Sequence, residues 1–160
     1  MKILVDGYNL LHASGVFGEV RGAGGFEASR RALLDEIARL TGAAASGVTV
    51  IFDAADAPPG LPDRYQHAGI DVRFARHHAS ADALIEDLVE DHDAPTALTV
   101  VSSDNRVIAA ARRRRAKPVG SAEWLTGLRA QARAAGEPGD TKPREPGPEG
   151  ADEWKRYFGL

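Results

Sequence analysis

Short apolar runs rich in β-branched residues alternate with segments of helical periodicity, and this alternation limits the folds open to the chain more than any other feature. Such runs are typical of strands buried on both faces, and they occupy residues 3–5, 48–52, 72–75 and 98–101, with a short run at 117–119. The segments between them predict helices over residues 26–40, 81–92, 105–114 and 121–134. Strands that alternate with helices pair in parallel through right-handed crossovers. We therefore predict an α/β domain with three layers, α/β/α, around a mainly parallel sheet.

Two stretches of the chain depart from this alternation. Residues 13–25 contain five glycines and predict a mobile surface loop. Residues 137–150 contain four prolines and three glycines, a composition typical of a linker. Beyond them, Trp154 and Phe158 have the spacing of one face of a short docking helix. The predicted organisation is one domain over residues 1–134, a Pro/Gly-rich linker over 135–150 and a C-terminal tail over 151–160.

Composition excludes several classes of protein. The chain has 160 residues, the size of a single domain, and it contains no cysteine, which excludes disulfides, thiol nucleophiles and cysteine-ligated metals. The first apolar run is too short for a secretory signal, and no run reaches the roughly 18 residues of a membrane helix. We therefore expect a cytoplasmic protein with no membrane partner. A net charge of −3 argues against a protein that coats nucleic acid by bulk charge alone.

Acidic residues occur where the predicted strands end. Asp6 directly follows the first strand, Asp53 ends the second, and Asp104 follows the fourth after two serines. Asp82 lies in the first turn of the helix after the third strand, with Glu86 one turn further along the same side. Each acid alone has a structural explanation as an N-cap or first-turn residue. Because parallel strands end at one edge of the sheet, together they predict a carboxylate cluster that a cation or bound protons must neutralise.

The ligand chemistry of such a cluster favours a hard divalent cation. Oxygen ligands without cysteine favour Mg²⁺ or Mn²⁺, and a substrate phosphate completes the coordination of such ions, so phosphoryl chemistry is expected. The segment Asp6-Gly7-Tyr8-Asn9 stands where dinucleotide-binding and P-loop folds have their glycine motifs, so no nucleotide cofactor is expected. Tyr8 also stands where haloacid-dehalogenase phosphatases need a second Asp, and the G-x-S-x-G motif of serine hydrolases is absent.

A set of short motifs resembles one family. The motifs are Val5-Asp6-Gly7-Tyr8-Asn9, Phe52-Asp53-Ala54, Ser80-Ala81-Asp82 with Ile85-Glu86, and Ser102-Ser103-Asp104. In order and spacing they resemble the NYN-domain ribonucleases of the PIN-like superfamily, in the YacP-like branch. Arg30 and the segment 120–125 extend the resemblance, which covers roughly residues 3–125, and Ser80 departs from it because a Thr is expected there. The resemblance implies a PIN-like, Rossmann-like domain.

The same resemblance implies metal-dependent endonucleolytic cleavage of single-stranded RNA, in which a metal-activated water attacks a phosphodiester. It assigns one or two Mg²⁺ or Mn²⁺ ions to a core of Asp6, Asp82 and Asp104, with Asp53 and Glu86 as outer ligands or as groups behind the ligands. Asn9 is implied to orient a metal-bound water or a substrate phosphate. Ser103 is expected to bond a phosphate or a neighbouring carboxylate.

Basic residues predict where substrate phosphates bind. Arg73 and Arg76 lie near the acidic edge and are candidates for phosphate contacts. Arg30 is a candidate for substrate binding or for an ion pair with one of the acids, because a buried guanidinium needs a carboxylate partner. The run 112–115 closes a helix at the opposite edge of the sheet, where positive charge complements the helix dipole.

Other functions stay open at this point. One is a toxin-like PIN ribonuclease controlled by an antitoxin, which shares the chemistry and adds a tight protein partner. Another is an RNA- or ribosome-binding module whose acidic edge is vestigial. A phosphatase, or a nuclease acting on structured DNA, is a weaker alternative because so short a chain has no room for the helices that thread a DNA flap. The YacP-like resemblance also leads to the hypothesis that the ribosome is a partner and translated mRNA the substrate.

Overall fold

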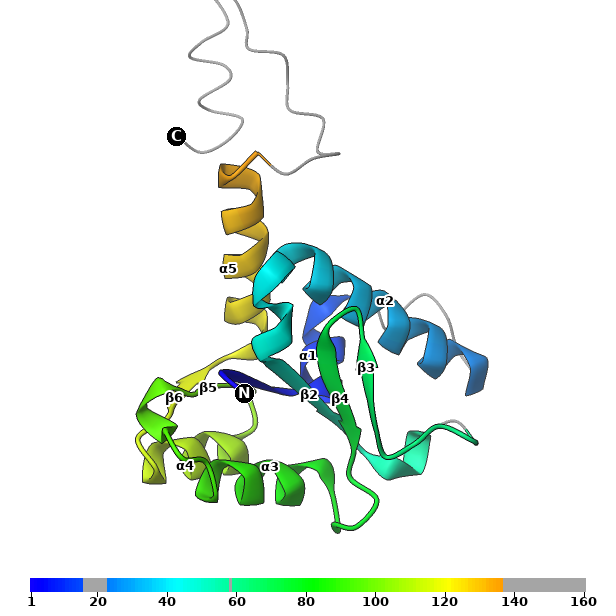
Figure 1. Cartoon of the computed structure of the whole chain (residues 1–160), viewed down its shortest axis with the longest axis vertical. Coiled ribbons are helices and arrows are strands. Elements are labelled where there is room, and N and C mark those ends of the chain that lie inside the picture. The colour runs from blue at the N-terminus through cyan, green and yellow to red at the C-terminus, as the bar shows by residue number, and fades with distance from the viewer. Residues whose placement is uncertain (16–22, 58, 137–160) are drawn as a thin grey trace, which may run out of the picture. The chain divides into compact units, whose positions relative to one another are not determined.

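The computed structural model describes residues 1–15, 23–57 and 59–136 of the chain (Figure 1). The strands are β1 (Ile3–Asp6), β2 (Val48–Phe52), β3 (Arg64–His67), β4 (Ile70–Phe74), β5 (Thr99–Val101) and β6 (Lys117–Val119). The α-helices are α1 (Gly7–Ser14), α2 (Ala23–Thr41), α3 (Ala81–Glu90), α4 (Asn105–Arg113) and α5 (Ser121–Ala134). Short 3-10 helices lie at η2 (Gly42–Gly47), η3 (Ala54–Asp56) and η4 (Pro95–Ala97).

All described strands form one sheet in the order β3-β4-β2-β1-β5-β6. Every neighbouring pair is parallel except β3 and β4, which form an antiparallel hairpin at one edge. All five residues of β2 are buried, as a continuous apolar run predicts for a central strand covered on both faces. The predicted α/β class with a mainly parallel sheet is confirmed.

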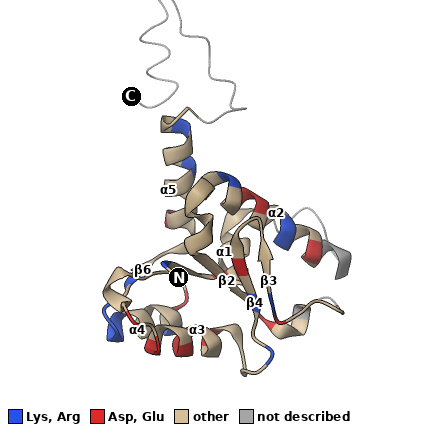
Figure 2. Cartoon of the chain, viewed as in Figure 1, with Lys and Arg blue, Asp and Glu red and all other residues tan. Residues whose placement is uncertain are grey.

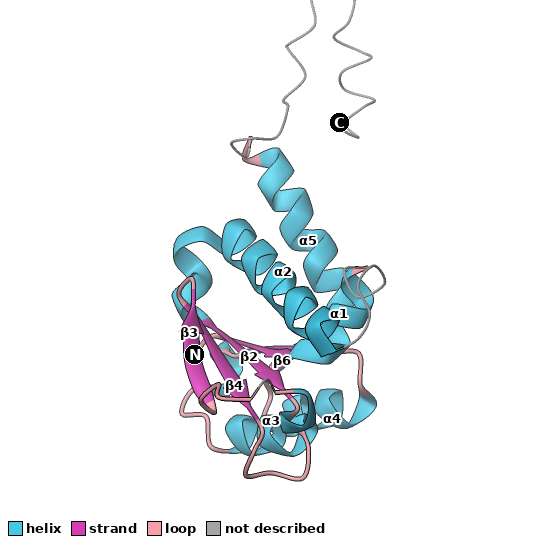
Figure 3. Cartoon of the chain, turned by 90° about the vertical axis from the view of Figure 1, so that its right-hand side faces the viewer, coloured by secondary structure: helices cyan, strands magenta, loops and turns pink. Residues whose placement is uncertain are grey.

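Helices cover both faces of this sheet, with α1 and α2 on one side and α3 and α4 on the other (Figure 3). Because side chains alternate along a strand, each strand contributes to two separate cores. Under α2, five strand valines form one core cluster with Leu33 and Leu34. Under α3 and α4, Leu4 and Ile51 pack against Ile85 and its neighbours. The predicted three layers are therefore present.

Gly7 allows α1 to begin directly after β1. A Cβ atom at this position would lie 2.6 Å from Cδ1 of Phe52 and 2.7 Å from the carbonyl oxygen of Ile51. Real Cβ contacts do not approach so closely, so any other residue forces the helix away from β2. The absence of a side chain here keeps the first turn of α1 against the edge where β1 and β2 end.

The structure differs from the sequence prediction at helix α1, at the loop after it and at strand β3. The loop predicted over residues 13–25 is wrong at both ends, because α1 extends to Ser14 and α2 begins at Ala23, while residues 16–22 lie outside the described part of the chain. The strand β3 was not predicted. It has no apolar run, and its residues alternate between exposed and half-buried, as expected for an edge strand. A tight turn through Ala68 and Gly69, both with positive φ, joins it to β4.

The chain divides into two compact units, residues 1–128 and 129–160. The predicted linker over 135–150 lies outside the described residues from residue 137 onward, as does the whole predicted tail over 151–160, so the predicted boundaries at 134 and 150 stay predictions. In the part of the chain that the structure describes, no helix combines the length and the apolar character that crossing a membrane requires.

Candidate functional site

Two of the predicted acids lie where the order of the strands reverses. The chain builds β2 and β4 outward on one side of β1, then crosses to place β5 on the other side. Asp6 is the last residue of β1, and Asp104 follows β5 as the N-cap of α4. In open α/β sheets the loops diverge at such a reversal, and ligands bind in the crevice between them. Both acids therefore occupy the position at which folds of this class bind ligands.

Ser102 connects these two acids. Its Oγ donates a hydrogen bond to Oδ2 of Asp6 at 2.8 Å and accepts one from the backbone N–H of Asp104 at 3.0 Å. Ser102 is 1% exposed and Asp6 is 6% exposed, so the contact between them is shielded from bulk water. Asp104 in turn caps α4, because its Oδ1 accepts from the backbone N–H of Arg106 at 2.8 Å. One continuous network thus runs from the end of β1 to the start of α4.

Burial raises the pKa of Asp6 from 3.8 to about 6. Removal from water is the largest cause, and the negative charges of Asp82 and Asp104 raise the pKa further. Hydrogen bonds from Ser102 and from the backbone of Asn9 act in the opposite direction. The ionised form of Asp6 is therefore destabilised, and a cation beside it would lower its pKa.

Asp82 shows the same effect in a more open position. Burial is the largest cause of its raised pKa, followed by the charge of Asp104, whereas Arg106 lowers it. Asp53 and Glu86 raise it by smaller amounts. Asp82 therefore lies within electrostatic reach of carboxylates that come from the ends of β2 and β5 as well as from its own helix.

Asp53 and Ser80 fix the start of α3. Oδ1 of Asp53 accepts from the backbone N–H of Ala81 at 2.7 Å, and Oγ of Ser80 accepts from that of Ala83 at 3.2 Å. Ser80 thus performs the capping expected of a Thr at this place. Because Asp53 binds the first turn of α3, it helps to set the position of Asp82.

Glu86 forms ion pairs with two arginines of α4. Its Oε1 accepts from Nε of Arg106 at 2.6 Å and also contacts Nη2 of that residue, while Oε2 lies 3.6 Å from Nη2 of Arg113. Acidic residues of α3 and basic residues of α4 are marked in Figure 2. The pairing brings the guanidinium of Arg106 within electrostatic reach of Asp82 and Asp104.

Asn9 and two serines join three separate segments of the chain. Oδ1 of Asn9 accepts from the backbone N–H of Ser103 at 2.8 Å and from Oγ of Ser121 at 2.6 Å. Oγ of Ser103 accepts from the backbone N–H of Ser121 at 3.2 Å. The side-chain oxygens of Asn9 and Ser103 therefore hold together the starts of α1 and α5 and the segment before α4.

Arg30 is buried on the face of the sheet that α2 covers. It is 2% exposed, and its Nη1 donates to the hydroxyl of Tyr8 at 3.3 Å. Its guanidinium carbon also lies 5.5 Å from the ring centre of Phe74 and 6.0 Å from that of Phe52. Asp6 instead shares the face of Ile51, which packs under α3. The predicted role of Arg30 in substrate binding stays a prediction.

The other two predicted phosphate contacts are each paired with an acid. Arg73 donates through Nε and Nη2 to Oδ2 of Asp71, at 3.1 and 3.0 Å. Arg76 pairs with Asp63 and donates to the carbonyl of Leu61 at 3.2 Å. Both arginines belong to β4 or to the residues directly after it, near the carboxyl edge of the sheet.

The donor chemistry of this edge fits a hard divalent cation, because every predicted ligand is a carboxylate and two of these carboxylates are destabilised in their ionised form. The side-chain positions are a stricter test. Among the residues that the structure describes, no three acidic or histidine side chains are close enough to hold one metal ion. An ion bound by three of these carboxylates therefore requires the side chains to turn from the positions seen. The metal site predicted from the sequence stays a prediction.

Three residues with contacts in this region were given no role by the sequence reasoning. Ser102 bonds Asp6, Ser121 bonds Asn9, and Arg106 pairs with Glu86. The available signal for Ser102 was its place directly after an apolar strand and two residues before an acid. Arg106 lies in the first turn of α4, unlike the other arginines of that helix, but its pairing with Glu86 depends on how α3 packs against α4.

Comparisons with known proteins agree with this fold and these motifs. The chain matches the YacP-like NYN domain over residues 3–155. The crystal structure of Rae1 (YacP) from Bacillus subtilis is similar, with 25% identity, a TM-score of 0.67, and coverage of 85% of this chain and 78% of that one. Its W164L mutant gives 27% identity, a TM-score of 0.65, and coverage of 84% and 79%. No curated protein sequence matches. Since the domain match spans nearly the whole sequence, the chain belongs to the YacP-like NYN family.

Proposed function

We propose that this chain is a divalent-metal-dependent endoribonuclease that cleaves single-stranded RNA. Membership of the NYN family indicates a nuclease, and the likeness to YacP indicates RNA as the substrate. The observation that carries the finer proposal is the placement of Asp6 and Asp104 where the strand order reverses, joined through Ser102, with Asp82 within electrostatic reach of Asp104. A hard cation among these carboxylates would stabilise their ionised forms, and a substrate phosphate would complete its ligands.

The residues divide into three proposed groups. Asp6, Asp82 and Asp104 bind the ion, which when bound activates water and neutralises charge on the phosphate. Asp53 and Glu86 support the metal-binding residues from further out, because Asp53 holds the first turn of α3 and Glu86 holds Arg106. Asn9 is proposed to orient the attacking water or a substrate phosphate, and the proposed substrate contacts are Ser103, Arg30, Arg73 and Arg76.

The proposed reaction is an in-line displacement at phosphorus. A water oxygen bonds to the phosphorus while the bond to the 3′ oxygen breaks, so the water loses a proton and the 3′ oxygen gains one. The products carry a 5′-phosphate and a 3′-hydroxyl. Arginine side chains would hold the non-bridging oxygens of neighbouring phosphates, for which their paired N–H groups are suited.

Cleavage assays with labelled single-stranded RNA test this proposal. We expect the wild type to cleave with Mn²⁺ and not with EDTA, and Asp104→Asn to be inactive. Glu90→Gln is the matched control, because Glu90 is an exposed acid at the end of α3 and its loss removes the same charge. RNA binding without cleavage by the wild type would instead favour the binding-module alternative, and co-purification of a tight protein partner would favour the toxin alternative.

We further propose translated mRNA as the substrate and the ribosome as a partner. This finer proposal is tested by following the decay of a reporter transcript in cells with and without the protein. Decay that requires the protein and stops when translation is blocked would support it. Decay that continues at the same rate without translation would contradict the ribosome as a partner and leave the ribonuclease proposal intact.

A further inference from the structure

A row of paired residues leads from Asp6 across the sheet to two arginines. The register pairs Asp6 with Ile51, Ile51 with Arg73, and Arg73 with Arg64. Residues paired in this way present their side chains on the same face. Neighbouring strands lie about 4.8 Å apart, so the backbones of Arg73 and Arg64 lie roughly 10 Å and 14 Å from that of Asp6. The row therefore continues from the acidic site to the edge strand β3.

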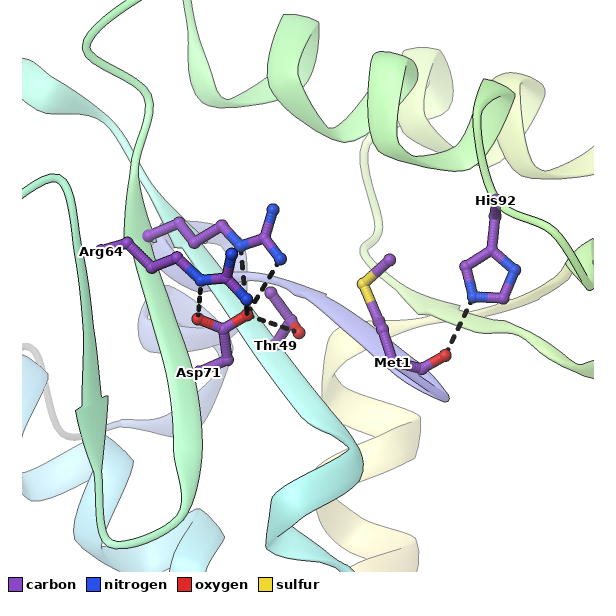
Figure 4. A network of polar contacts seen from close by, with 6 residues as sticks. Met1, Thr49, Arg64, Asp71 and His92 are labelled. Atoms are coloured by element: carbon purple, nitrogen blue, oxygen red, sulfur yellow. Dashed lines mark hydrogen bonds and ion pairs between the residues drawn. The ribbon is translucent and has the colours of Figure 1, made fainter.

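Asp71 holds both guanidinium groups on this face (Figure 4). Arg64 donates from Nε to Oδ1 at 2.9 Å and from Nη2 to Oδ2 at 3.1 Å. Arg73 donates to Oδ2 through two nitrogens, and Oγ1 of Thr49 donates to the same oxygen at 3.4 Å. Two arginines on one carboxylate leave an excess positive charge, and in these contacts Nη1 of each arginine remains for an anion.

Stability alone does not account for the second arginine. Side chains of like charge directly opposite each other on antiparallel strands destabilise a sheet, and Arg64 stands opposite Arg73. One arginine suffices to neutralise Asp71. The side chain of Arg64 is 63% exposed, so its guanidinium can be reached from solvent while Asp71 holds it. The arrangement is instead suited to an anion that approaches from solvent.

We propose that Arg64 and Arg73, held in place by Asp71, bind the backbone of a single-stranded RNA a few nucleotides from the phosphate that is cleaved. The inference rests on the proposed function, because it takes RNA to be bound at the edge that carries Asp6. Arginine N–H groups match phosphate oxygens, and side chains already fixed by a carboxylate lose less conformational entropy on binding. The hairpin of β3 and β4 then extends the substrate surface beyond the metal-binding acids.

Substrates of two lengths separate this contact from the chemistry. We use RNAs of about 4 and about 16 nucleotides, the range covered by one single-strand-binding module. With the longer RNA and Mn²⁺, Arg64→Gln is expected to raise KM several-fold and leave kcat unchanged, whereas cleavage of the shorter RNA is unaffected. In EDTA, the slope of log K against log salt for the longer RNA is expected to fall by about 0.7, the value of one phosphate contact on a single strand.

Arg31→Gln is the matched control. Arg31 lies on α2, on the other side of the sheet, and its side chain is 69% exposed beside Glu27 at i−4. The substitution removes the same charge, so it should leave KM and the salt slope at the wild-type values. Thermal unfolding of each variant checks that the fold is retained, which the exposure of both side chains favours.

Two results overturn the inference. One is an Arg64→Gln variant that matches the wild type on the longer RNA in both KM and salt slope. The other is an Arg31→Gln variant that weakens binding as much as Arg64→Gln, since net charge and not position would then be responsible. Either result leaves Mn²⁺-dependent cleavage of the shorter RNA in place, so the proposed function survives. Failure of the wild type to cleave either RNA overturns the proposed function itself, and failure to bind RNA overturns both.

Discussion

Replacing Asp6 with Asn should abolish cleavage and yet stabilise the fold at neutral pH. The side chain keeps its size, and its carbonyl can still accept the hydrogen bond from Ser102. What it loses is a charge that is unfavourable in the folded protein, where the pKa of Asp6 is raised from 3.8 to about 6. A difference of this size corresponds to about 3 kcal/mol between the charged and the neutral form.

The sign follows from proton binding. Between pH 4 and pH 6 the folded protein binds a proton at Asp6 that the unfolded chain has already released, so wild-type stability falls as the pH rises through that window. Above pH 6 the wild type has lost this whole contribution to its stability. In EDTA, Asp6→Asn should therefore gain about 2 to 3 kcal/mol relative to the wild type between pH 4 and pH 8. Any fixed cost of burying the new amide cancels in that comparison.

Urea unfolding at pH 4, 6 and 8 measures this difference, and repeating the series with Mn²⁺ provides the control. An ion that binds only the folded wild type stabilises it by mass action, whereas the variant, which lacks one carboxylate of the proposed metal-binding core, should gain less. A variant whose stability relative to wild type is independent of pH would refute the reasoning about Asp6. A variant that cleaves RNA at the wild-type rate would refute its place in the site.

Three further substitutions are predicted to separate the roles of neighbouring residues. Ser102→Ala removes a buried hydroxyl that bonds Asp6 and the backbone of Asp104, so urea unfolding should show a loss of about 1 to 3 kcal/mol, and the pKa of Asp6 measured by NMR should rise further. Gly7→Ala forces a methyl group against Phe52 and should lower the free energy of unfolding by about 1 to 3 kcal/mol; an unchanged midpoint would contradict the close approach of α1. In Mn²⁺ titrations, Asp82→Asn should weaken binding by about tenfold or more, and Glu86→Gln by clearly less, because Glu86 already pairs with arginines; equal effects would make both of them direct ligands.

Apolar periodicity predicted most of the sheet and most of the helices. Strand β2 is buried at every residue, and the buried residues of α3 recur along one face. Such patterns can be recognised in a sequence without knowing how the elements pack. The edge strand β3 was not predicted because the sequence Arg64-Tyr65-Gln66-His67 is typical of a polar connection. It forms a strand only by pairing with β4. Helix α1 was not predicted because its first turn depends on the close fit of Gly7 against β2, which is a tertiary contact.

The candidate site was predictable at the level of position and less so at the level of contacts. Topology places Asp6 and Asp104 at the edge where β1 and β5 meet, and that follows from the order of acids and strands in the sequence. The partners of the side chains do not follow from it. The contact of Ser102 with Asp6 depends on where β5 ends relative to β1. The pairing of Arg106 with Glu86 depends on how α4 packs on α3. Whether three carboxylates meet at one point depends on rotamers, which no sequence pattern encodes.

The bond between Asn9 and Ser121 limits how far this fold can be trimmed. A chain that stops before the last strand and helix still contains every acid of the proposed core, yet it loses the hydroxyl that holds Asn9 and the N–H bound by Ser103. Those contacts bridge 112 and 18 residues of sequence, so the residues after β6 hold the start of α1 and the segment before α4 in place. A minimal fragment built around the acidic motifs alone should therefore keep the ligands and lose their alignment.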